Sequence, residues 1–223
     1  MILDQTTDRF FASSSVRLAL GEATKLINSD QHAEAQVVLD DCLRKALDSQ
    51  TTSGLHDIAV LYVYTAIAAD AGHESERALE ILSEGILTIS SRDPSERFYQ
   101  SRLFAVQLWL LEKAGKYEDA LSIAKLAVEK IMPPTCEGDG LTNMYLEDLY
   151  FQYSSLLQKR GEDELALATL QGIADRCAHA LTNYGPLAFM EEGKFERFWL
   201  NQIATDARTA LAMKGRSREA PQG

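Results

Sequence analysis

Small and apolar residues recur along this chain in four stripes, each beginning at an alanine and spaced like one face of an α-helix. The members of each stripe stand 0, 3, 4, 7, 8 and 11 residues from its first position. The starting alanines are Ala35, Ala78, Ala120 and Ala166, so the stripes repeat after 43, 42 and 46 residues. A fixed period of this length is typical of stacked helical hairpins, in which each unit buries its apolar face against its neighbours.

Each stripe marks the second helix of a hairpin, and the residues before it predict a first helix. We expect first helices over 16–28, 55–71, 95–114 and 141–160, and second helices over 31–49, 74–90, 116–131 and 162–180. Short turns join the two helices at Ser29-Asp30, Gly72-His73, Gly115 and Gly161, and glycine there favours a left-handed helix end. No alternating pattern long enough for a strand occurs, so the predicted fold class is all-α.

The ends of the chain predict a lead-in, a cap and a tail. We expect residues 1–15 to be an N-terminal lead-in, residues 16–213 a single helical repeat domain, and residues 214–223 a disordered tail. A last helix over 194–213 places Phe195, Phe198 and Trp199 on one side and would cap the open end of the stack. The connection over 132–142 contains adjacent prolines and an acidic run, which favours a flexible edge or a spacer.

The third unit carries a family resemblance. It has Gly115 and Tyr117 at the turn, Ala120 at the close helix crossing, small residues along the second helix, and then Pro133. It resembles the tetratricopeptide repeat, and the similarity extends over roughly residues 16–180, although the period exceeds the usual 34 residues. The resemblance implies that the single domain over residues 16–213 is tetratricopeptide-like. It would be a right-handed superhelix of about four antiparallel hairpins, a solenoid whose concave groove is lined by first helices and holds peptides or partner helices.

Matching the chain to the repeat assigns side chains to that groove. The assigned residues are Tyr64, Ile67, Arg102, Trp109, Lys113, Phe151, Gln152, Ser155 and Lys159. Tyr64, Trp109 and Phe151 would be the aromatic anchors for a partner segment. The alternative is that these three side chains pack between helices. Co-chaperone members of the family grip a carboxylate with polar side chains, whereas the corresponding positions here are mostly apolar, so we expect no such clamp.

Charge and composition exclude several classes of partner. The formal net charge is −11 and the sequence pI is about 4.8, which disfavours nucleic acid and anionic membrane surfaces as partners. The most apolar stretch, residues 58–69, is too short to cross a bilayer, so no membrane insertion is expected. The three cysteines are widely spaced and form no CxxC motif, which favours a reducing cytoplasmic location.

No catalytic or cofactor motif is present in the sequence. The four histidines form no metal-binding spacing, and neither a phosphate-binding loop nor a nucleophile elbow occurs. We therefore expect a non-enzymatic adaptor, scaffold or chaperone-like module without cofactor or metal, which binds a protein or peptide partner. The alternative is a regulatory sensor that binds a small molecule or signalling peptide and controls a separate effector. Self-association through an exposed end of the stack is left open.

Overall fold

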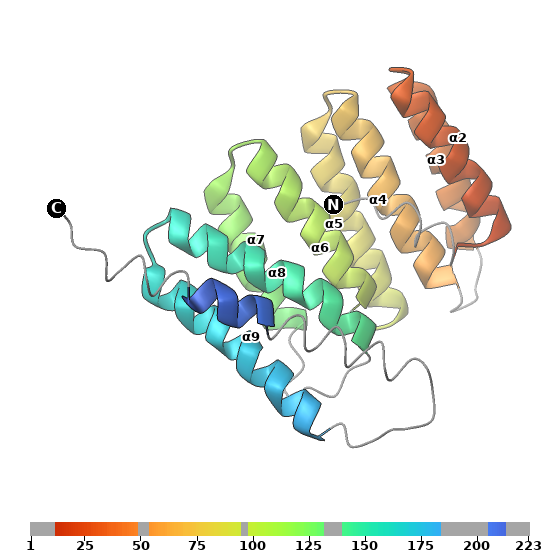
Figure 1. Cartoon of the computed structure of the whole chain (residues 1–223). Coiled ribbons are helices and arrows are strands. Elements are labelled where there is room, and N and C mark those ends of the chain that lie inside the picture. Colours follow the sequence, from red (N-terminus) through yellow and green to blue (C-terminus); the bar gives the residue numbers. More distant parts are fainter. Residues whose placement is uncertain (1–11, 49–53, 95–97, 132–139, 184–204, 213–223) are drawn as a thin grey trace. The chain divides into compact units, whose positions relative to one another are not determined.

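The computed structural model describes residues 12–48, 54–94, 98–131, 140–183 and 205–212 (Figure 1). All regular secondary structure within these ranges is helical, which confirms the all-α prediction for the described part of the chain. The helices are α2 (Ser14–Asn28), α3 (His32–Asp48), α4 (Leu55–Ala71), α5 (Ser75–Arg92), α6 (Phe98–Lys113), α7 (Tyr117–Ile131), α8 (Gly140–Lys159) and α9 (Asp163–Asn183). Residues 205–212 form a further helix. Most of the predicted capping helix, the chain ends and the acidic part of the 132–142 connection lie outside the described residues.

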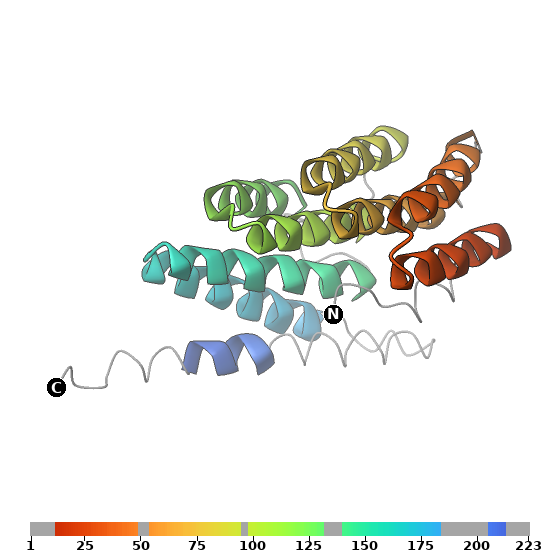
Figure 2. The ribbon, with the colours of Figure 1, turned by 90° about the horizontal axis from the view of Figure 1, so that it is seen from above.

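The chain forms two compact units, Met1–Lys116 and Tyr117–Gly223. In the first unit, α4 is the central helix and packs against α2, α3, α5 and α6. The first helices α2, α4 and α6 lie side by side, while α3 and α5 cover them from one side (Figure 2). Because α4 has neighbours on so many sides, most of its residues are buried and it shows no single apolar stripe. In the second unit, α8 packs against both α7 and α9.

The four hairpin turns share one backbone geometry. Their left-handed residues are Asp30, His73, Gly115 and Gly161, with φ of 58°, 65°, 71° and 87°. In each turn, the N–H of the following residue donates to a carbonyl five residues earlier, at 2.9 Å, as in a Schellman motif. Each starting alanine of the stripes comes five residues after the left-handed residue, and all four alanines are fully buried. The repeat seen in the sequence therefore recurs in the fold as one hairpin.

Glycine occupies the left-handed position in only two of these turns. The prediction is confirmed at Gly115 and Gly161 and is wrong at Gly72, whose φ is −77°. In that turn His73 takes the left-handed conformation, which costs a residue with a Cβ more than it costs glycine. The left-handed residue stands five positions before the buried Ala78, as it does before the alanine of every other hairpin. This spacing, and not the preference of the turn for glycine, decides that His73 takes the left-handed conformation.

Gly85 lets α5 approach α4 closely. A Cβ built on Gly85 would lie 2.8 Å from Cγ of Tyr62, closer than two carbon atoms can pack. Tyr62 is 1% exposed, and its hydroxyl donates to Oε1 of Glu84 at 3.1 Å and lies 3.2 Å from Oγ1 of Thr88. The missing side chain at Gly85 therefore places the Tyr62 ring under α5, with its hydroxyl beside Glu84.

Candidate binding site

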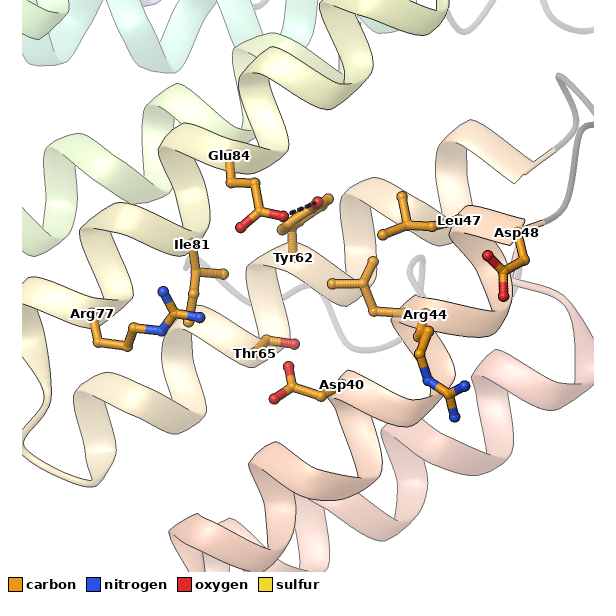
Figure 3. A pocket seen from close by; sticks show the side chains of 10 residues that line it. Asp40, Arg44, Leu47, Asp48, Tyr62, Thr65, Arg77, Ile81 and Glu84 are labelled. Carbon is orange, nitrogen blue, oxygen red and sulfur yellow. Dashed lines mark hydrogen bonds between the residues drawn. The ribbon is translucent and has the colours of Figure 1, made fainter.

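A cavity of about 340 Å³ opens between α3 and α5 in the first unit, with α4 at its floor (Figure 3). We call it the furrow and define it by ten residues: Asp40, Leu43, Arg44, Leu47, Asp48, Tyr62, Thr65, Arg77, Ile81 and Glu84. The second helices α3 and α5 supply its walls, because each stripe turns inward onto α4 and leaves the charged side chains beside it on the outer edge. Apolar side chains of α3 and α5 thus line the inner part of the furrow, next to α4, and charged side chains line its outer edge.

The two arginines of the furrow already have carboxylate partners outside it. The guanidinium of Arg44 lies 2.6 Å from Oδ1 of Asp41, and that of Arg77 lies 3.2 Å from Oε2 of Glu80. Each pair joins neighbours on the same helix, three residues apart. These pairs reduce the positive charge that the arginines present to a ligand in the furrow.

The acids of the furrow are not neutralised in the same way. Among the residues that the structure describes, Asp40, Asp48 and Glu84 form no ion pair within 4.0 Å. Partial burial raises the pKa of the Asp40 carboxyl; the charge of Arg77 opposes this rise and the charge of Glu84 adds to it. Asp40 and Glu84 therefore repel each other across the furrow, and a cation placed between them would relieve that repulsion.

Tyr62 and Thr65 form the polar part of the floor. Burial raises the pKa of the Tyr62 hydroxyl, and this group remains a neutral hydrogen-bond donor to Glu84. The Thr65 hydroxyl donates to the carbonyl of Leu61 at 2.8 Å, so its hydrogen is used within α4. The floor thus orients the Glu84 carboxylate. The charge of Arg92, whose guanidinium donates to the carbonyl of Leu47, also acts on the Tyr62 hydroxyl and opposes the rise of its pKa.

The predicted groove residues of the first unit have very different exposures. Tyr64 is 1% exposed and Arg102 is 4% exposed, so neither presents a surface to a partner in this structure. For Tyr64 the structure shows the alternative, in which the ring packs between helices. Ile67 and Trp109 are half-buried and Lys113 is exposed.

Lys113 and Trp109 lie together beside a buried carboxylate. Nζ of Lys113 lies 2.5 Å from Oδ2 of Asp70, whose side chain is 7% exposed, and 5.3 Å from the centre of the Trp109 ring. Oδ1 of Asp70 also accepts a hydrogen bond from the Ser75 hydroxyl at 2.9 Å. Asp70 of α4 is thus joined to Ser75 of α5 and to Lys113 of α6, so Lys113 supports the packing of successive hairpins, and Trp109 lies beside its ammonium group.

The predicted groove residues of the second unit all have some exposed surface. Phe151 and Gln152 are half-buried, and Ser155 and Lys159 are exposed. Nζ of Lys159 lies 5.0 Å from the ring centre of Tyr117, a cation–π contact between α8 and the start of α7. Lys159 stands two residues before the left-handed residue of its turn, as Lys113 does, so both lysines contact the preceding hairpin from the same repeat position.

The furrow was not among the sites that the sequence predicts. Its charged side chains could have been found as residues flanking the stripes, such as Asp40 and Arg44 beside members of the first stripe and Arg77 and Glu84 beside members of the second. The sequence does not say which of them face one another, since that depends on how α3 and α5 lie on α4.

Comparison with protein-family models, with curated proteins and with solved structures gives no match to this chain. Within the residues that the structure describes, no three His, Cys, Asp or Glu side chains are grouped so that they could hold a metal ion. In the same ranges, no helix combines the length and the apolar character that a membrane span requires.

Proposed function

We propose that this chain is a tetratricopeptide-like interaction module that acts as a non-enzymatic adaptor or scaffold for a partner protein. One observation carries the proposal: the same hairpin turn occurs four times, each with a buried alanine five residues later. A protein assembled from repeated hairpins has an extended surface relative to its size, and such surfaces are used for binding. A right-handed superhelix with a concave groove belongs to this proposal.

The binding residues on the first helices are those that retain exposed surface. They are Ile67, Trp109 and Lys113 in the first unit, and Phe151, Gln152, Ser155 and Lys159 in the second. Trp109 is the most informative of them, because aromatic side chains with partly exposed rings are frequent energetic centres of interfaces.

The test is capture by the full chain, followed by direct binding of each purified candidate in a calorimeter. The proposal predicts a saturable complex with at least one protein and no turnover of that protein. Trp109→Ala should weaken the complex at unchanged helicity if the first-helix surface is used. Absence of any saturable complex, or chemical conversion of the captured molecule, would contradict the proposal.

A sensor of small molecules is the second candidate, and the furrow is the observation that favours it, because 340 Å³ lies within the size range of small-ligand sites. A small molecule that binds the folded chain would raise its melting temperature, and the rise would grow with the logarithm of the ligand concentration above Kd. A scaffold would show this rise only with the partner protein or its binding segment.

A further inference from the structure

We propose that the furrow receives a lysine or arginine side chain of an extended partner segment, with the charged head between Asp40 and Glu84. This inference rests on the proposed interaction function and names the chemistry of the partner. It does not involve Trp109 or the other residues that the sequence assigns to the groove.

The distribution of charge selects a cation. The furrow contains three carboxylates and two arginines, and both arginines are paired with carboxylates outside it. The remaining negative charge is divided between two walls, with Asp40 on α3 and Glu84 on α5 (Figure 3). The hydrogen bond from Tyr62 holds Glu84 in place before a ligand arrives, so less conformational entropy is lost on binding.

The apolar part of the furrow suits the stem of such a side chain. Leu43 and Ile81 are 8% and 5% exposed, and Leu47 is half-buried at the same wall as Leu43. Lysine and arginine bury their methylene stems against apolar surface while the charged head stays among polar groups. A compact metal ion would leave this apolar surface uncovered.

The length of the furrow favours a chain segment over a single small cation. Its lining residues on α3 run from Asp40 to Asp48, which corresponds to about 12 Å of helix. An extended peptide advances about 3.3 Å per residue, so three or four residues would occupy the furrow. The formal charge of −11 would also attract a basic segment over longer distances.

The experiment is an NMR titration of the full chain with pentapeptides of serine and alanine that carry lysine, arginine, norleucine or glutamate at the centre. The expected result is that the lysine and arginine peptides shift amides within 40–48, 62–65 and 77–84, while the other two do not. Asp40→Asn/Glu84→Gln should weaken the binding of the lysine and arginine peptides at least tenfold. The matched control is Glu34→Gln/Glu74→Gln, which removes the same charge from exposed positions on and beside the same helices and should leave binding unchanged.

Three results of the titration would overturn the inference. They are equal binding by Asp40→Asn/Glu84→Gln and the unaltered chain, equal binding of the norleucine and lysine peptides, and binding of spermidine at the same amides as tightly as the peptides. A captured partner that binds Asp40→Asn/Glu84→Gln normally would also overturn the inference while the interaction function stands. Failure to find any saturable partner would instead overturn the proposed function.

Discussion

The contact between Gly85 and Tyr62 predicts that adding one methyl group to α5 destabilises the first unit. The Cβ of Gly85→Ala would lie 2.8 Å from Cγ of Tyr62, about 0.7 Å inside the optimal separation of two carbon atoms. The Tyr62 ring cannot rotate away easily, because it is 1% exposed and its hydroxyl contacts Glu84 and Thr88. Relief therefore requires a shift of the helix or of the ring.

The size of the effect follows from two opposing terms. Overpacking of a buried site costs about 1–3 kcal/mol, whereas replacing glycine by alanine inside a helix gains about 1 kcal/mol. We expect Gly85→Ala to lower the free energy of unfolding by about 1 kcal/mol. Gly21→Ala is the matched control, because Gly21 lies inside α2 of the same unit and a Cβ there has nothing within 4 Å. Gly21→Ala should raise the free energy of unfolding by about 1 kcal/mol, so the same glycine-to-alanine change should stabilise the chain at one site and destabilise it at the other.

Urea unfolding followed by tryptophan fluorescence measures this prediction. A Trp199→Phe background leaves Trp109 as the only tryptophan, so the signal reports the first unit. In a Tyr62→Ala background, the clash is absent and Gly85→Ala should become neutral or stabilising. The reasoning is refuted if Gly85→Ala stabilises the unaltered chain as much as Gly21→Ala does.

Four further predictions concern the turns and the charges. His73→Gly should raise the free energy of unfolding by about 1 kcal/mol in urea denaturation, because φ at this position is 65°; a loss of stability would contradict the turn geometry. Lys113→Met should lower the free energy of unfolding by about 1–2 kcal/mol, because it leaves the buried Asp70 carboxylate without its cation. The further change Asp70→Asn should recover part of that loss. If Lys113→Met leaves the free energy of unfolding unchanged, the ion pair does not stabilise the packing. Burial raises the pKa of Asp40 in the folded state above its ordinary value of 3.8. The stability that its protonated form contributes is therefore fully present below pH 3.8 and is lost as the pH rises through the pKa of the folded state. Asp40→Asn should raise the urea midpoint at pH 7 and leave it unchanged near pH 3. Asp41→Asn should act oppositely at pH 7, because hydrogen bonds from Lys45 and Arg44 lower the pKa of Asp41, and equal effects of the two variants would refute this assignment.

The helices were predictable because two independent signals agree. The stripes give the buried face of each second helix, and the turn residues give its start, so the expected and observed ends differ by only a few residues. The second hairpin shows the clearest agreement, since its first helix is expected and observed over Leu55–Ala71. The exception within the turns is His73, where the spacing to the buried Ala78 outweighs the preference for glycine.

The binding surface was less predictable, since it depends on which helix covers which face. α4 is apolar almost all round, so its sequence does not distinguish a side chain in a groove from one between helices. Tyr64 was assigned to the groove by matching the chain to the tetratricopeptide repeat, and its ring is buried. The furrow depends on Asp40 and Glu84 lying on facing walls, which is a property of the packing and leaves no periodic signal in either helix.

Fold and function both depend on one hairpin being repeated, and the backbone of its non-glycine turns tests this most directly. In residues other than glycine, the intraresidue Hα–HN nuclear Overhauser effect is strong only where φ is positive, and Asp30 and His73 can be measured in the labelled full chain. The account predicts strong effects at both residues and a weak one at Ser29, whose φ is −107°. Weak effects at both Asp30 and His73 would show that the first two hairpins turn differently from the others, and the repeat would not exist.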